Sequence, residues 1–182
     1  YDFSNEEVLE GYKRKISEYL SKGSISIGQL QDMHVLDVGT GWQALALHKL
    51  GAKSVDHFDL SPENTKRLKK FINDNNLKNI ASTTANVEGY EFQKEKYDFI
   101  FLDGITPALS DVGLGLNNIL KSLKPQGLMH AYFYRSGTFS MFCIHIIRNL
   151  MLLKYGDDWC SDYSLMEKYH SMALVVLGDN LN

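Results

Sequence analysis

The sequence predicts an α/β fold in which helices cover a mostly parallel sheet. Segments with strand-like and helix-like periodicity alternate along most of the chain, which is the pattern of repeated strand–helix–strand units. The chain has 182 residues, of which 44% are apolar, so it can bury one sizeable core. This length favours a single domain over two.

The first 30 residues are expected to form a helical cap ahead of the sheet. Apolar side chains recur on one helical face over Glu6–Leu20, which predicts an amphipathic helix. Residues 31–135 are expected to form the core of the domain and 136–182 a helix followed by a C-terminal strand.

Five strands are predicted in the core, each a short run rich in apolar or β-branched residues. They are His34–Val38, Ser54–Phe58, Ile80–Thr84, Tyr97–Leu102 and Gly127–Phe133. The helices expected between them are Gln43–Leu50, Pro62–Asn73 and Leu114–Leu123. The third crossing, near Val87–Glu95, is too short to hold a helix, whereas the others have room for one.

The helix that begins at Pro62 has the clearest start signal. Ser61 suits the N-cap, Pro62 the first helical position, and Glu63 the positive end of the helix dipole. Further along, Lys124–Gly127 has the composition of a tight turn that leads into the fifth strand.

Composition and charge exclude several classes of protein. The chain carries 19 Lys and Arg against 22 Asp and Glu, so no strongly basic surface for nucleic acid is expected. The most apolar stretch, Phe139–Leu153, is shorter than the roughly 20 residues of a membrane span and includes Arg148. Cys143 and Cys160 form neither a zinc motif nor a disulfide framework, so a cytoplasmic location is expected.

The segment His34–Ala44 (HVLDVGTGWQA) has the pattern of a ligand-binding loop. An apolar strand leads into Asp37, then Gly39 and Gly41, and then the start of a helix. Ligands of open α/β sheets bind at the carboxyl ends of strands, where glycine lets main-chain N–H groups approach the ligand. The glycine spacing alone fits both dinucleotide binders and other nucleoside binders.

Three polar residues follow later strands. Asp59 comes 20 positions after Gly39 and can accept hydrogen bonds from two ribose hydroxyls, or it is a carboxylate at the entry of the next helix. Asn86 can pair with an adenine edge, or it holds its own turn. Asp103 ends a buried strand, so its carboxylate is expected at a cleft or at solvent.

Five segments together resemble class I S-adenosylmethionine-dependent methyltransferases. They are VLDVGTGWQA, VDHFDLSPEN, TTANVEGYEF, YDFIFLDGI and LKSLKPQGLMHAYF, which lie between Met33 and Phe133. The resemblance implies a Rossmann-like three-layer sandwich and S-adenosyl-L-methionine as the cofactor. It also implies that the loop with Asp37, Gly39, Thr40 and Gly41 holds the methionyl part, Asp59 the ribose, and Leu60, Asn86 and Val87 the adenine.

Asp37 favours this family over nicotinamide dehydrogenases, because a carboxylate beside the glycines would repel a pyrophosphate but attract an ammonium group. On the acceptor side, Asp103 is the candidate catalytic residue. Residues on or just beyond the fifth strand that are candidates to bind or deprotonate the acceptor, or to pack against a helix, are His130, Tyr132, Tyr134 and Arg135. The Asp-Asn pair of metal-dependent catechol-type relatives is not found, so no metal is expected.

The resemblance fades after the fifth strand. The apolar helix predicted at 139–153 is expected to pack on the sheet, to line an apolar substrate pocket or to form a homo-oligomer interface. Met172–Leu177 is predicted as a sixth strand, and no sequence is left for the seventh strand of the usual sheet. Truncation, disorder and a different topology are the alternatives there.

The expected function is methyl transfer from S-adenosylmethionine to a small-molecule acceptor whose identity no motif gives. The alternatives are a nucleotide-dependent oxidoreductase and a non-catalytic partner subunit that keeps the fold. These three hypotheses differ in cofactor binding and in product formation.

Overall fold

The computed structural model describes residues 2–105, 108–133 and 139–156. The chain divides into two compact units, Tyr1–Phe133 and Tyr134–Asn182. The second unit contributes one described helix, α6 (Phe139–Tyr155). The predicted strand at Met172–Leu177 lies outside the described residues, as do Tyr134 and Arg135.

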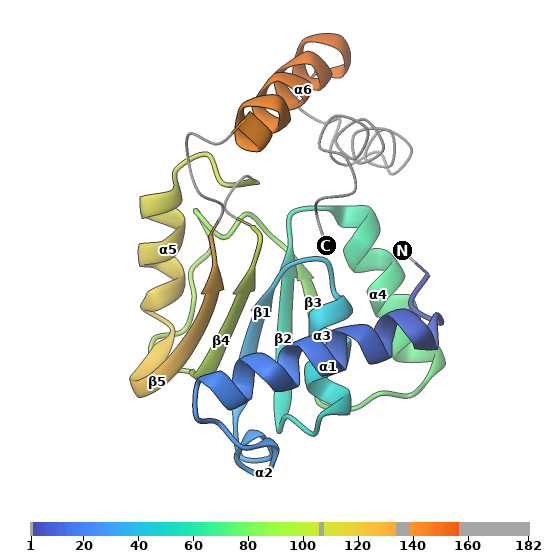
Figure 1. The fold of residues 1–182 in the computed structure, drawn as a ribbon, viewed down its shortest axis with the longest axis vertical. Helices are drawn as coiled ribbons and strands as arrows, with labels where there is room; N and C mark the ends of the chain where they lie inside the picture. The colour runs from blue at the N-terminus through green and yellow to red at the C-terminus, as the bar shows by residue number, and fades with distance from the viewer. Residues whose placement is uncertain (1, 106–107, 134–138, 157–182) are drawn as a thin grey trace. The chain divides into compact units, whose positions relative to one another are not determined.

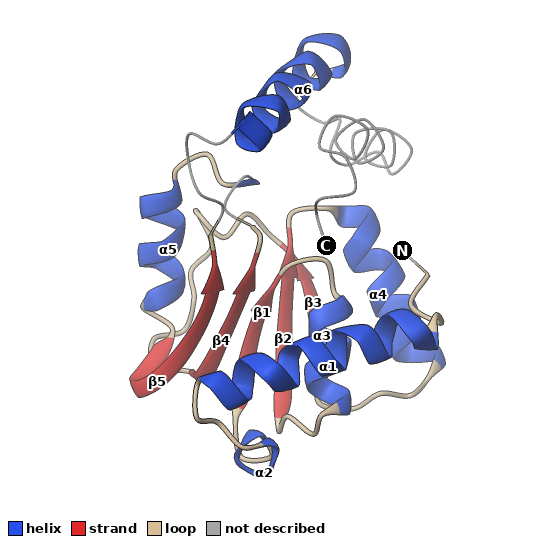
Figure 2. Ribbon diagram, viewed as in Figure 1, coloured by secondary structure: helices blue, strands red, loops and turns tan. Residues whose placement is uncertain are grey.

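Within the described residues, the first unit contains one parallel sheet of five strands (Figure 2). The strands are β1 (His34–Val38), β2 (Ser54–Asp59), β3 (Ile80–Thr84), β4 (Tyr97–Asp103) and β5 (Leu123–Tyr132). Their order across the sheet is β3-β2-β1-β4-β5. The chain therefore builds outward from β1 to β3 and then returns to the other side of β1 with β4. This reversal is where open α/β sheets bind their ligands.

Helices cover both faces of the sheet, as predicted for the α/β class (Figure 1). They are α1 (Glu6–Lys22), α2 (Ile27–Leu30), α3 (Trp42–Lys49), α4 (Pro62–Asp74) and α5 (Val112–Leu120). Helices α1, α3 and α4 pack on one face, and α5 packs on the other.

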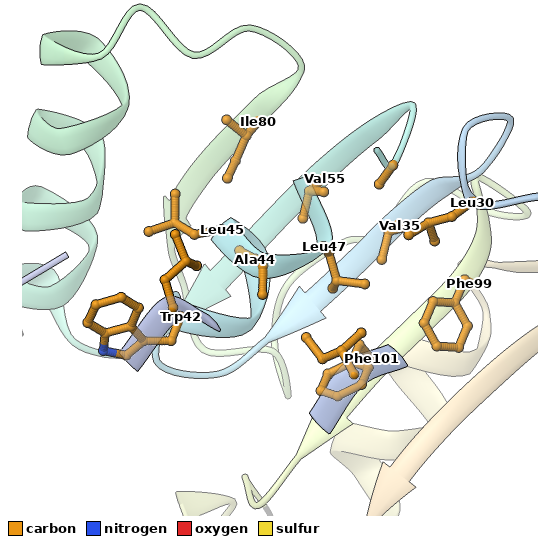
Figure 3. Packing of buried hydrophobic residues seen from close by; sticks show 14 of the residues in the cluster. Leu30, Val35, Trp42, Ala44, Leu45, Leu47, Val55, Ile80, Phe99 and Phe101 are labelled. Carbon is orange, nitrogen blue, oxygen red and sulfur yellow. The ribbon is translucent and has the colours of Figure 1, made fainter. Parts of the chain in front are cut away.

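Helix α3 lies at the centre of the first core. Figure 3 shows its side chains Ala44, Leu45 and Leu47 beside Val35 of β1 and Val55 of β2. Helix α1 packs against α3 and adds Leu9, Ile16 and Leu20 to the same cluster. Because α3 is covered on both sides, it is apolar around most of its circumference.

The second core lies on the opposite face of the sheet. Leu36 and Leu102 point there, while Val35 and Phe101, one residue away, point to the first core. Ile119 of α5 packs on this face and is fully buried. Burial on both faces explains why β1 and β4 are almost continuously apolar.

Helix α4 begins where the sequence predicts. The N–H of Asn64 donates a hydrogen bond to Ser61 Oγ at 3.3 Å, which confirms Ser61 as the N-cap, and Pro62 occupies the first turn. The short helix α2 was not expected. It is held by a capping box in which Ser26 and Gln29 bind each other's backbone N–H groups.

Strand β5 begins at Leu123, four residues before the predicted start at Gly127. The predicted turn is instead a bulge inside the strand: the pairing passes from Leu123 to Leu128 while β4 advances only from Tyr97 to Phe99. Gln126 has a φ of 65°, the left-handed conformation that turns use. Turn-forming residues therefore bend the strand without ending its pairing.

Candidate functional site at the carboxyl edge of the sheet

The candidate site lies where the strand order reverses, at the carboxyl ends of β1, β2 and β4. The register pairs Asp37 with His57 on one side and with Phe101 on the other. Two residues further along each strand come Gly39, Asp59 and Asp103, which therefore lie at one edge of the sheet. The structure thus brings together the candidate residues at the carboxyl ends of these three strands.

The loop between β1 and α3 requires glycine at Gly41. This residue has a φ of 94° and is the N-cap of α3. A Cβ atom on Gly41 would lie 2.9 Å from Leu68 Cδ2 and 3.2 Å from Phe3 Cζ. A Cβ on Gly39 would meet only ordinary contacts, the nearest at 3.6 Å, so space alone does not demand glycine there.

Asp37 is a buried carboxylate without a hydrogen-bond partner among the described residues. Its side chain is fully buried, and neither oxygen accepts a hydrogen bond. Burial raises the pKa of Asp37 well above its ordinary range, and the negative charges of Asp103 and Asp59 add to this effect. The nearby N–H of Ala44 in the first turn of α3 opposes the shift only in part, without hydrogen-bonding geometry. A buried carboxylate in this state favours a cationic partner.

Asp59 accepts hydrogen bonds from the start of α4, as expected if it is a carboxylate at the entry of that helix. Oδ1 accepts from the N–H of Ser61 at 2.9 Å, and Oδ2 accepts from Asn64 Nδ2 at 3.0 Å. Burial raises the pKa of Asp59, and these hydrogen bonds limit the rise. Since each carboxylate oxygen can accept two hydrogen bonds, the two contacts leave capacity for a pair of ribose hydroxyls.

The three residues assigned to the adenine differ in their surroundings. Asn86 holds its own turn: Oδ1 accepts from the N–H of Glu88 at 3.0 Å, and Nδ2 donates to Glu88 Oε2 at 3.2 Å. Val87 is buried in the second core, whereas Leu60 is 47% exposed next to Asp59. A role for these residues at an adenine remains a prediction.

Asp103 forms an ion pair with a helix far away in the sequence. Lys15 Nζ of α1 donates to Asp103 Oδ2 at 3.0 Å. The Asp103 side chain is only 10% exposed and that of Lys15 is 48% exposed. Burial would lower the pKa of Lys15, but the hydrogen bond and charge of Asp103 outweigh it and raise that pKa. The carboxylate expected on the acceptor side is therefore paired with the ammonium group of Lys15.

His130 lies on β5 beside the same edge. Its ring stacks between Tyr19 of α1, with centroids 4.2 Å apart, and Phe101 of β4, at 4.6 Å. Its Nε2 atom is buried without a hydrogen-bond partner in the described part of the chain. Burial lowers the pKa of His130, although the charge of Asp103 opposes the shift. The lowered pKa favours the neutral form of the imidazole.

Sequence reasoning missed the contribution of α1. Tyr12, Lys15 and Tyr19 are spaced so that they lie on one helical face, and this face reaches the site. Tyr12 stacks on Trp42 at the start of α3, with ring centroids 6.0 Å apart and planes 3° from parallel. The available signal was Lys15 between Tyr12 and Tyr19, on the apolar face of the predicted helix.

A comparison with protein families identifies the domain. A family described as "Methyltransferase domain" matches residues 35–127, which are half of the chain and run from β1 into β5. The chain belongs to this methyltransferase family. The match covers Asp37, the glycine loop, Asp59 and Asp103, so these site residues lie inside the family's domain.

Similar proteins support the same family and fold. The methyltransferase domain is 31% identical over 127 residues to a ubiquinone biosynthesis O-methyltransferase of Bartonella tribocorum, covering 69% of this chain and 51% of that protein. The chain thus spans about half the length of this relative.

Two solved structures share the fold of the methyltransferase domain. One is a putative S-adenosylmethionine-dependent methyltransferase of Methanococcus maripaludis, with a TM-score of 0.57, 20% identity, and coverage of 94% of this chain and 78% of that one. The other is a putative sarcosine dimethylglycine methyltransferase of Galdieria sulphuraria, with a TM-score of 0.58, 23% identity, and coverage of 87% and 59%. The Rossmann-like class I fold predicted from the sequence is confirmed.

The cofactor of this family is S-adenosylmethionine, and the residues of the methyltransferase domain fit it. The fit rests on Asp37, because its unpartnered carboxylate offers a counter-charge to the cofactor's ammonium group. Asp59 offers the acceptor capacity that two ribose hydroxyls require.

Two further features bear on partners. Among the described residues of the methyltransferase domain, no cluster of three or more His, Cys, Asp or Glu side chains could hold a metal ion. None of the helices described is long and apolar enough to cross a membrane. Metal-independent chemistry stays a prediction.

Proposed function

We propose that the protein is an S-adenosylmethionine-dependent methyltransferase that acts on a small-molecule acceptor. The observation that carries this proposal is the fully buried carboxylate of Asp37, which has no hydrogen-bond partner among the described residues and whose pKa Asp59 and Asp103 help to raise. The carboxylates at this edge, of which Asp103 alone forms an ion pair among the described residues, repel the pyrophosphate of a dinucleotide and favour a ligand with positive charge. This charge pattern supports a methyltransferase over a nicotinamide-dependent oxidoreductase.

The residues at the end of β1 would bind the methionyl part of the cofactor. In our proposal Asp37 holds the ammonium group, and Gly39, Thr40 and Gly41 line the loop beside it. The bound cofactor supplies an electrophilic methyl group on a sulfonium. Binding would offset the desolvation cost of the buried Asp37 carboxylate, since the carboxylate gains a cationic partner.

The residues after β2 and β3 would bind the adenosine. Asp59 accepts the ribose hydroxyls in addition to its contacts with Ser61 and Asn64. Leu60 is exposed beside it and is suited to cover an apolar ring face. Asn86 and Val87 complete the adenine side through their loop, which Asn118 Nδ2 fixes by donating to the Val87 carbonyl at 2.7 Å.

Asp103, Lys15 and His130 would form the acceptor side. In this arrangement Lys15 keeps a positive charge beside Asp103, and neutral His130 offers a base on the same side. A neutral base matters when the acceptor atom carries a proton, as a hydroxyl does. The name of the Bartonella relative, an O-methyltransferase, supports a hydroxyl-bearing acceptor.

Calorimetry and product analysis test the proposal. S-adenosylhomocysteine and NAD are titrated separately into the protein, and a panel of phenols, carboxylic acids and amines is then incubated with methyl-labelled S-adenosylmethionine. We expect binding of S-adenosylhomocysteine, none of NAD, and label transfer to a hydroxyl-bearing compound. Binding of NAD in preference would favour the oxidoreductase, and cofactor binding without any product would favour a non-catalytic partner subunit.

Assembly and location belong to the same proposal. We retain a homo-oligomer through residues 139–153 as a prediction, because this apolar helix needs a covering surface. A cytoplasmic location rests on the unpaired pattern of Cys143 and Cys160. No nucleic-acid partner is expected from a net charge of −3.

A further inference from the structure

A histidine is buried in the middle of the sheet next to the glycine loop. His57 is fully buried on β2, between Asp37 of β1 and Ser82 of β3 in the register. Its neighbours in the strand include buried Val55 and Phe58. A buried imidazole costs desolvation energy that an apolar side chain would avoid, so its hydrogen bonds must offset that cost.

Both ring nitrogens of His57 have partners. Nε2 lies 2.8 Å from the carbonyl oxygen of Gly39, and Nδ1 lies 2.9 Å from Ser82 Oγ. A carbonyl only accepts, so Nε2 carries the proton, and in the neutral ring Nδ1 accepts from the Ser82 hydroxyl. Burial lowers the pKa of His57, which favours this neutral form, although the Gly39 carbonyl and the charge of Asp59 oppose the shift.

This arrangement fixes Gly39 from both sides. Its N–H donates to the Phe58 carbonyl at 3.1 Å, and its C=O accepts from His57. Strand β2 therefore holds both peptide groups of Gly39, although glycine has the greatest backbone freedom of all residues. A Cβ on Gly39 would meet only ordinary contacts, so no tight packing marks this position. The hydrogen bond from His57 is one of two that tie Gly39 to β2.

We propose that His57 is a positioning residue that preorganises the glycine loop for the cofactor. The inference rests on the proposed function, because it concerns the loop that lies between Asp37 and α3. A ligand binds more tightly when the groups that contact it are already held in place. An apolar residue at position 57 would fill the volume and leave the Gly39 carbonyl without this donor.

Two substitutions separate the hydrogen bond from simple packing. The amide nitrogen of Gln can reach the place of Nε2, whereas that of Asn reaches only the place of Nδ1. S-adenosylhomocysteine binding is measured by calorimetry for the parent, His57→Gln and His57→Asn. We expect His57→Asn to weaken binding about tenfold, the scale of one hydrogen bond, and His57→Gln to stay within about threefold of the parent. His48→Asn, in α3 and without a bond to the loop, is the control and should bind like the parent.

Folding is checked by far-UV circular dichroism and thermal unfolding of each variant. Equal weakening by Gln and Asn, or none by either, in folded proteins overturns the inference. If His57→Asn does not fold, ¹⁵N NMR of the parent decides: we expect the Nε2–H tautomer both without ligand and after addition of S-adenosylhomocysteine. The Nδ1–H tautomer in the free protein, or a change of tautomer on binding, overturns the inference. A parent that does not bind S-adenosylhomocysteine at all contradicts the proposed function instead.

Discussion

Lys15 Nζ lies 3.0 Å from Asp103 Oδ2, although the two residues are 88 positions apart in the sequence. The contact joins α1 to the carboxyl end of β4 at the edge where the strand order reverses. The acceptor side of the candidate site is therefore built by two distant parts of the chain. Asp103 is also neutralised by a neighbour, so it acts together with Lys15 rather than as a free carboxylate.

The first prediction concerns this ion pair. Asp103→Asn and Lys15→Met should each lower kcat by about tenfold or more, because both remove charge from the acceptor side. S-adenosylhomocysteine affinity should stay within about threefold of the parent. Lys15→Met should change unfolding free energy by less than about 1 kcal/mol, since the lysine is half exposed. Undiminished turnover in Asp103→Asn would reduce this residue to a structural partner of α1.

The second prediction concerns the ribose. Asp59→Ala should weaken S-adenosylhomocysteine binding by about 1–3 kcal/mol, because buried hydroxyl contacts lose their acceptor. Asp74→Ala is the control, since it removes the same charge from the exposed end of α4. Calorimetry of both variants measures the difference. A folded Asp59→Ala that binds as tightly as the control would show that the ribose lies elsewhere.

The third prediction is that Asp37 favours function at the expense of stability. Asp37→Asn should abolish cofactor binding but raise the unfolding free energy near pH 7, because the folded state then no longer buries a carboxyl group whose pKa is raised. Thermal unfolding without cofactor measures this gain. A less stable Asp37→Asn at pH 7 would mean that the carboxylate has a stabilising partner.

The pH dependence of that gain has a definite sign. The pKa of Asp37 in the folded protein is raised above its ordinary value of 3.8, so between these values the folded state binds the extra proton. The contribution of Asp37 to the unfolding free energy therefore falls as the pH rises from 3.8 toward the raised pKa of the folded protein. The advantage of Asp37→Asn should shrink toward pH 4 and grow toward neutral pH. A difference in unfolding free energy between Asp37→Asn and the parent that is constant with pH would contradict the raised pKa.

The fourth prediction concerns the glycine loop. Gly41→Ala should destabilise the fold by about 1–3 kcal/mol, because alanine is strained at a φ of 94° and its Cβ would press on Leu68 and Phe3. Gly11→Ala is the matched control, since Gly11 lies inside α1 with open space around its Cβ position. The control should stabilise by about 0.5–1 kcal/mol through helix propensity. Denaturant unfolding of both variants compares them, and equal effects would argue against strain at Gly41.

Local signals predicted most of the fold. The start of α4 could be located because Ser61 and Pro62 act within one helical turn. Strands β1 and β4 could be located because burial on both faces makes them continuously apolar. The start of β5 could not, because turn-forming residues form a bulge whenever the neighbouring strand continues the pairing.

Local signals also predicted part of the candidate site. Asp37, Asp59 and Asp103 lie at or next to the carboxyl ends of their strands, and parallel strands end at one edge, so their proximity follows from topology. Lys15 and His57 act through contacts that depend on how α1 and β3 pack, which no local pattern specifies. A charged residue on an apolar helix face and a histidine inside a buried strand were the available signals.

A crystal structure with S-adenosylhomocysteine would show whether the carboxyl edge of the sheet binds the cofactor. We predict the amino group of the ligand at the buried carboxylate of Asp37 and both ribose hydroxyls within hydrogen-bonding distance of Asp59, with Gly39 held by His57 as it is without ligand. A ligand bound away from the carboxyl ends of β1 and β2, or one that leaves Asp37 without a cationic partner, would contradict it.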